Sequence, residues 1–159
     1  ETLQVVRDVV EDCRKAGIPS VIENLVYPLP GSDKLTPEER ETAIIESARL
    51  LTDLKPELLK LEYPGSAAGC RKLADVVTVP WAVLSAGVDF ATFTDVLMVS
   101  CVEGGASGFI AGRSVWKEAI GLTGAEGKTF LDEVARPRLA ACREAVAGRT
   151  RPWFDVAGA

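Results

Sequence analysis

A lysine interrupts an apolar run in the segment LLKLEYPG, which spans residues 58–65. Because the side chains of a β-strand alternate between its two faces, Lys60 would share one face with Leu58 and Glu62. The other face would be apolar and suited to packing against helices; it consists of Leu59, Leu61 and Tyr63. Lys60 is therefore expected to point into a barrel. Burial lowers the pKa of a lysine, and a neutral amine attacks carbonyl groups to form a Schiff base.

A glutamate occupies a similar position in the preceding apolar run, SVIENLVYP, residues 20–28. Glu23 would share a strand face with Val21 and Leu25, and an inward orientation would bring it within reach of Lys60. Its carboxylate could hold the amine in place, or move protons during the carbinolamine and enamine steps. Alternatively, Glu23 and Lys60 could form a structural ion pair without a catalytic role. Both interpretations follow from the same strand periodicity.

Two glycine-containing turns are suited to binding an anion. Ser85-Ala86-Gly87 precedes a helix that Asp89 is expected to cap, and it offers a hydroxyl and backbone N–H groups at the helix start. Gly112-Arg113-Ser114 follows the next strand and adds a guanidinium. Such turns on adjacent late strands form a recurrent phosphate site of barrels. The residues predicted to bind phosphate are Ser85, Ala86, Gly87, Gly112 and Arg113.

The elements that position these residues alternate along the chain. Apolar periodicity predicts helices over residues 2–16, 36–54, 67–77, 89–103, 114–119 and 124–147. Strands are expected over residues 19–27, 58–63, 81–87 and 105–112. Thr36 is expected to cap its helix, with Pro37 at the first helical position, and Ser114 is expected to cap the short helix that follows it.

Strands that alternate with helices are typical of a parallel sheet with right-handed crossovers. Four such units fit either an open doubly wound sheet or half of a (β/α)8 TIM barrel, whose full length is typically about 250 residues. A doubly wound sheet usually has a glycine-rich loop after its first strand, but here that strand ends in Val26-Tyr27-Pro28. We therefore predict one α/β domain, residues 1–159, that corresponds to the C-terminal four βα units of a barrel.

Composition excludes several classes of protein. A net charge of −5 and the lack of a basic stripe argue against a nucleic-acid partner, and no apolar segment reaches the roughly 18 residues of a membrane span. The sequence contains no histidine, which excludes Ser-His-Asp and Cys-His mechanisms for this chain alone. The four cysteines (Cys13, Cys70, Cys101 and Cys142) have no metal-site spacing, so we expect buried free thiols in a reducing cytoplasm, no metal and no cofactor.

Five segments together resemble the C-terminal half of class I tagatose-1,6-bisphosphate aldolases and the related sulfofructosephosphate aldolases. They are IPSVIENLVYP, LLKLEYPG, PWAVLSAGVDF, GASGFIAGRSVWKEA and ARPRL, and they span essentially the whole chain. The resemblance implies a TIM barrel in which Lys60 forms the Schiff base, Glu23 is the acidic residue of the preceding strand, and the two turns bind phosphate. It also implies cleavage of a ketose bisphosphate, or of a sulfonated analogue, to dihydroxyacetone phosphate and a three-carbon aldehyde.

The four N-terminal strands of such a barrel have no counterpart in the sequence. An open half barrel would expose apolar surface and two sheet edges, so we expect either a homo-oligomer or a missing N-terminal half. A close variant of the predicted activity is a Schiff-base aldolase of the deoxyribose-phosphate type. An alternative of another class is a non-catalytic half barrel that binds a sugar phosphate or forms an assembly, with Lys60 and Glu23 as a structural ion pair.

Overall fold

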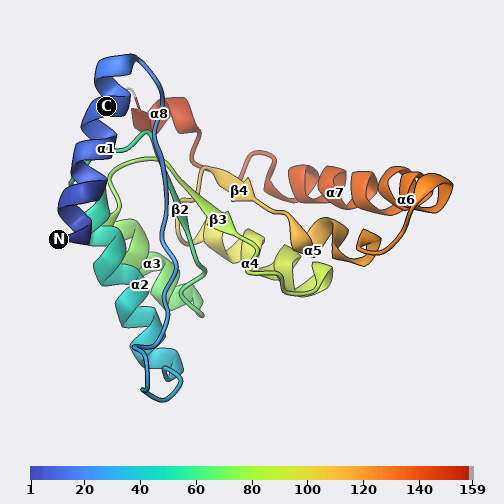
Figure 1. Ribbon diagram of the computed structural model, residues 1–159, viewed down its shortest axis with the longest axis horizontal. Helices are drawn as coiled ribbons and strands as arrows, with labels where there is room; N and C mark the ends of the chain where they lie inside the picture. Colours follow the sequence, from blue (N-terminus) through green and yellow to red (C-terminus); the bar gives the residue numbers. More distant parts are fainter. Residues whose placement is uncertain (158–159) are drawn as a thin grey trace.

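Four parallel strands form the centre of the computed structural model, which describes residues 1–157 (Figure 1). The strands are β1 (Val21–Glu23), β2 (Leu58–Leu61), β3 (Trp81–Leu84) and β4 (Gly108–Ile110), and their order in the sheet is β1-β2-β3-β4. Each strand pairs with the next one along the chain, so the order never reverses as it does in a doubly wound sheet. The structure confirms the predicted α/β fold with a parallel sheet.

Three helices cover one face of the sheet: α2 (Pro37–Thr52), α3 (Ala67–Val76) and α4 (Phe90–Val102). Leu59 and Leu61 of β2 are fully buried against them, whereas Lys60 faces the opposite side. The predicted alternation along this strand is therefore confirmed. The buried core consists of Ala48, Leu51, Leu54, Leu59, Leu61, Leu73, Val77, Trp81, Val83, Phe93, Leu97, Cys101, Ala106 and Cys142.

Local sequence signals explain where the main helices begin. The Thr36 hydroxyl accepts a hydrogen bond from the Glu39 N–H, and the Glu39 carboxylate accepts one from the Thr36 N–H, which completes a capping box at the start of α2. Asp89 caps α4 through the N–H of Thr92, as predicted. The hydrogen bond from the Thr92 hydroxyl lowers the pKa of Asp89, so this cap is charged at neutral pH.

All four strands are shorter than predicted, and β1 and β4 differ most from the prediction. β1 covers residues 21–23 of the predicted 19–27, and β4 covers residues 108–110 of the predicted 105–112. Pro28 and Pro30 follow β1 and have no N–H with which to extend a ladder. The apolar residues between Glu23 and Pro28 lie in an irregular segment instead, where Leu25 and Tyr27 line the cavity described below.

The C-terminal third differs most from the prediction. The expected helix over residues 124–147 consists of α6 (Gly124–Phe130), a π-helical turn (Leu131–Ala135) and α7 (Arg136–Val146), which together extend away from the sheet (Figure 1). Pro137 explains the wider turn, because proline has no N–H and its ring clashes with the carbonyl four residues earlier. Helix α8 (Trp153–Ala157) was not predicted; the indole N–H of Trp153 donates to the Glu57 carbonyl at 3.2 Å.

Two further α-helices and a short 3-10 helix (Lys117–Ala119) complete the described chain. Helix α1 (Thr2–Ala16) precedes the sheet and ends at Gly17, which has the left-handed conformation (φ 68°) typical of a helix stop. Helix α5 (Arg113–Trp116) follows β4. Within residues 1–157, none of the helices has the length and apolar character needed to cross a membrane.

Candidate active site

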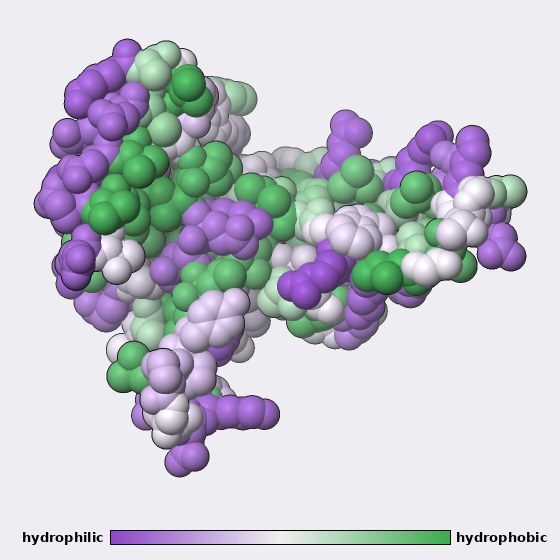
Figure 2. Space-filling model, viewed as in Figure 1, coloured by the Kyte–Doolittle hydropathy of each residue, from purple (hydrophilic) through white to green (hydrophobic). Residues whose placement is uncertain are grey.

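A cavity of about 640 Å³ lies at the carboxyl ends of the four strands. All seven residues singled out in the sequence line it: Glu23, Lys60, Ser85, Ala86, Gly87, Gly112 and Arg113. They converge because the carboxyl ends of parallel strands meet at one edge of a sheet, although the residues are up to 90 positions apart (23 to 113). On the surface, a hydrophilic patch lies over β2 and is bordered by hydrophobic residues (Figure 2).

Lys60 and Glu23 form an ion pair across the first two strands. They are direct partners in the strand register, and Lys60 Nζ lies 2.9 Å from Glu23 Oε2. The Lys60 side chain is 21% exposed and that of Glu23 43% exposed. The predicted proximity is therefore confirmed, but the lysine is less enclosed than a barrel interior would make it, because this face of the sheet is open. The contact fits both interpretations of the pair, catalytic and structural.

A second ion pair in the same cavity was not foreseen from the sequence. The buried carboxylate of Glu62 accepts a hydrogen bond from the Val26 N–H at 2.8 Å and another from the Arg40 guanidinium. Arg40 also donates to the Val26 carbonyl at 3.2 Å. These contacts hold the segment after β1 against the end of β2, and so help to fix Glu23 beside Lys60. Strand alternation placed Glu62 on the Lys60 face, but no pattern in helix α2 marked Arg40.

The turn after β3 has an unusual backbone conformation. Ala86 and Gly87 both have positive φ angles (49° and 76°), and the Val88 N–H donates to the Ser85 carbonyl at 3.2 Å. A non-glycine residue in this region is uncommon, and such residues gather at functional sites. Within residues 1–157, the backbone N–H groups of Ala86 and Gly87 have no acceptor. They are available to an anion in the cavity.

Arg113 adds a cation to this turn from the next strand. Its guanidinium lies over Gly87, so close that a Cβ added there would come 3.4 Å from the guanidinium carbon. The other two cations that line the cavity, Lys60 and Arg40, are each paired with a glutamate. Among the residues that the structure describes, Arg113 has no carboxylate partner. The β3–β4 end of the cavity is therefore its electropositive end.

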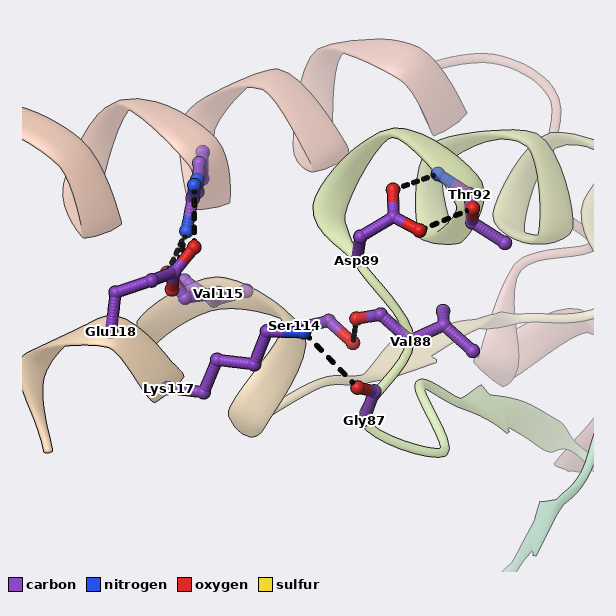
Figure 3. Close-up of polar contacts among 9 residues, drawn as sticks. Gly87, Val88, Asp89, Thr92, Ser114, Val115, Lys117 and Glu118 are labelled. Atoms are coloured by element: carbon purple, nitrogen blue, oxygen red, sulfur yellow. Dashed lines mark hydrogen bonds and ion pairs between the residues drawn. The ribbon is translucent and has the colours of Figure 1, made fainter.

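Ser114 connects the two turns instead of capping a helix. Helix α5 begins at Arg113, one residue before the predicted cap, and Ser114 is buried within it. Its hydroxyl donates to the Val88 carbonyl at 2.5 Å, and Lys117 Nζ lies 3.4 Å from the Gly87 carbonyl (Figure 3). The predicted cap was wrong because a buried hydroxyl finds its acceptor on the neighbouring turn.

The cysteines contribute to the core and not to this cavity. All four are free, and Cys70, Cys101 and Cys142 are buried, whereas Cys13 is only partly buried, contrary to the prediction. Burial raises the pKa of Cys70 and of Cys101 to about 11, which keeps both thiols protonated and unreactive at neutral pH. Within the described part of the chain, no three His, Cys, Asp or Glu side chains converge as metal ligands would.

A model of the family described as "DeoC/LacD family aldolase" matches residues 1–118, which is about three quarters of the 159-residue chain. The chain belongs to the DeoC/LacD aldolase family. All the predicted site residues lie within the matched part, since the last of them is Arg113. The α6–α7 extension lies outside it.

About half of each of two archaeal aldolase structures has the same fold as this DeoC/LacD family member. A crystal structure of an archaeal fructose 1,6-bisphosphate aldolase matches with a TM-score of 0.67 and 20% identity, covering 92% of this chain and 52% of that chain. An archaeal fructose-1,6-bisphosphate aldolase with its catalytic lysine bound to the carbinolamine intermediate matches with a TM-score of 0.63 and 20% identity, covering 91% and 51%.

A Schiff-base-forming fructose-1,6-bisphosphate aldolase matches with a TM-score of 0.58 and 20% identity, covering 85% of this chain and 51% of that chain. At this level of identity the likeness concerns the fold alone. The chain spans about half the length of these three structures.

Proposed function

We propose that the protein is a class I (Schiff-base) aldolase in which Lys60 is the nucleophile. The observation that carries this proposal is the placement of the Lys60 amine 2.9 Å from the Glu23 carboxylate, in a cavity whose other end contains the guanidinium of Arg113. Membership of the DeoC/LacD family supports the same reaction class. The arrangement pairs a carbonyl-trapping amine with a proton acceptor and an anion site.

Each step of the proposed reaction can be assigned to these groups. Glu23 accepts a proton from Lys60 Nζ, and the neutral amine attacks the ketone carbon to give a carbinolamine. The protonated Glu23 then returns this proton to the carbinolamine hydroxyl, which leaves as water and gives an iminium ion. The carboxylate then removes the proton of the hydroxyl next to the scissile C–C bond, and the bond electrons move into the iminium as the aldehyde leaves. Protonation of the resulting enamine and addition of water release the ketone and regenerate Lys60.

The substrate class that we propose is a phosphorylated ketose. A ketose bisphosphate such as tagatose 1,6-bisphosphate, or a sulfo-sugar phosphate analogue, would yield dihydroxyacetone phosphate and a three-carbon aldehyde. The five segments that resemble these aldolases support this choice. The cavity supports it too, because Arg113 and the free N–H groups of Ala86 and Gly87 can bind the phosphate while the ketone reaches Lys60.

Trapping of the Schiff base tests the proposal directly. The chain is incubated with dihydroxyacetone phosphate, reduced with borohydride and analysed by mass spectrometry. We expect a covalent adduct equal to dihydroxyacetone phosphate less one oxygen atom, mapped to the peptide that contains Lys60. The alternative, a non-catalytic half barrel in which Lys60 and Glu23 are only an ion pair, predicts no adduct at this position.

Replacing Arg113 with alanine is expected to weaken the binding of dihydroxyacetone phosphate by about tenfold or more, since a hydrogen bond to a charged group contributes roughly 1.5–3 kcal/mol. Isothermal titration measures the affinity. Arg49→Ala is the matched control, because Arg49 pairs with Glu46 on the outer surface of α2 and should leave the affinity unchanged. An Arg113→Ala chain that binds as tightly as the wild type removes this residue from the phosphate site.

We also propose that the four-stranded sheet is half of a (β/α)8 barrel, completed by a second copy of the chain or by an N-terminal half. The sequential strand order supports this arrangement, as do the two sheet edges, β1 and β4, which pair with no further strand among residues 1–157. Val21 on the β1 edge is 56% exposed, which is unusual for a strand valine. Light scattering of the 159-residue chain is expected to show a dimer or larger species; a monodisperse monomer would contradict closure by a second copy.

The free thiols fit the reducing cytoplasm that we expect.

A further inference from the structure

Arg138, on helix α7, makes a set of contacts that converge near the two phosphate turns. Its Nη1 donates to Glu118 Oε2 at 2.9 Å and to the Val115 carbonyl at 3.1 Å, and its Nη2 lies 2.9 Å from Glu118 Oε1. Its guanidinium carbon lies 5.3 Å from the centre of the Phe90 ring, within range of a cation–π contact. One side chain therefore contacts both α5 with the short turn after it and the start of α4.

These partners follow directly after the turns that line the cavity. Phe90 is the first residue of α4, three positions after Gly87, and Val115 comes two positions after Arg113. The close contacts of Figure 3 already join the turns to each other. Arg138 adds a second connection, between the helices that follow the two turns. It does so from α7, which packs on α4 and reaches the core through Cys142.

The chemistry of the contact requires a guanidinium. Only arginine can bind a carboxylate through two nitrogens, donate to a carbonyl and stack on an aromatic ring with one planar group. The side chain of Arg138 is 23% exposed, whereas that of Arg136 on the same helix is 76% exposed and pairs with Asp132 one turn earlier. The hydrogen bond from Arg138 lowers the pKa of Glu118, so the pair is fully charged at neutral pH.

We infer that Arg138 is a positioning residue for phosphate binding: it holds α4 and α5 so that the two turns before them contact the same phosphate. The inference rests on the proposed function, which assigns phosphate to these turns. Arg138 does not line the cavity, and it lies beyond residue 118, where the family match ends. Its effect on a ligand must therefore pass through the turns.

The affinity of the chain for inorganic phosphate tests this role. We expect Arg138→Ala to weaken phosphate binding by about tenfold, because misplaced donors lose much of their contribution. Arg138→Lys should fall between the alanine variant and the wild type, since lysine keeps the charge but not the two-nitrogen contact. Glu118→Gln separates positioning from simple electrostatics. Removing a negative charge alone would strengthen phosphate binding, whereas losing the ion pair between Arg138 and Glu118 would weaken it.

Two further variants complete the series, with thermal unfolding measured alongside. Arg136→Ala is the control from the same helix and should leave the phosphate affinity unchanged. Arg113→Ala reports on the phosphate site itself.

If Arg113→Ala weakens binding but Arg138→Ala and Glu118→Gln do not, the positioning role is wrong and the proposed function stands. If all of these variants bind like the wild type, the positioning role and the assignment of phosphate to these turns are both wrong. A lower melting temperature with unchanged affinity also overturns the inference, and if the alanine variant does not fold, Arg138→Lys and Glu118→Gln decide the question.

Discussion

Replacing Lys60 with methionine is expected to abolish the borohydride-trapped adduct with dihydroxyacetone phosphate. Methionine keeps much of the length and the apolar stem of lysine but has no amine, so neither a carbinolamine nor a Schiff base can form. The adduct should disappear from the intact-mass spectrum, and cleavage of a ketose bisphosphate should fall by about 10⁴-fold or more, as for loss of other covalent nucleophiles. This is the largest effect that we expect of any single substitution in the chain.

Two companion variants make the result specific. Lys72→Met is the matched control, because Lys72 also forms an ion pair with a glutamate (Glu41, 2.8 Å) but lies outside the cavity. It should form the adduct like the wild type. Lys60→Arg keeps a cation beside Glu23 without a nucleophilic amine, so it should fold and bind phosphate yet form no adduct. An adduct that persists in Lys60→Met would show that another amine is the nucleophile.

The strand periodicity around Lys60 was sufficient to predict much of this site. Alternation along LLKLEYPG placed two leucines in the core and the lysine on the open face, and the same rule placed Glu23 opposite it. Parallel pairing then accounts for the rest, because it brings the ends of β3 and β4 to the same edge. Capping residues such as Thr36 and Asp89 were reliable because their hydrogen bonds are local.

Contacts between distant segments were not predictable from the same patterns. The Arg40–Glu62 pair joins a helix to a strand end, and Arg138 reaches α5 from a helix 20 positions beyond Glu118. Neither follows from periodicity, since each depends on how two elements pack. Ser114 shows the same limit, because its local sequence resembles a cap while its acceptor lies on another turn. The positions of the candidate site residues could be predicted from the sequence, but the contacts that hold them in place could not.

Replacing Glu23 with glutamine is expected to slow C–C cleavage by about 10²- to 10⁴-fold, the usual contribution of a general acid–base group. Glutamine has nearly the same shape and can still accept a hydrogen bond from Lys60, but it cannot take up a proton at neutral pH. The phosphate affinity should not change, because the anion site lies at the β3–β4 end of the cavity. Rapid mixing with a ketose bisphosphate, followed by an assay of the released aldehyde, measures the cleavage step.

Glu57→Gln distinguishes catalysis from a structural ion pair. Glu57 connects the same two strands at their amino ends: its carboxylate accepts hydrogen bonds at 2.6 Å from both the N–H and the hydroxyl of Ser20. The hydrogen bond from that hydroxyl lowers the pKa of Glu57, so the substitution removes a charged strand contact, as Glu23→Gln does. If both variants lose thermal stability and neither loses cleavage rate, Glu23 is only structural. If cleavage falls in Glu23→Gln alone, the carboxylate acts on the substrate, because a strand contact at the opposite end of the same pair cannot reproduce the loss.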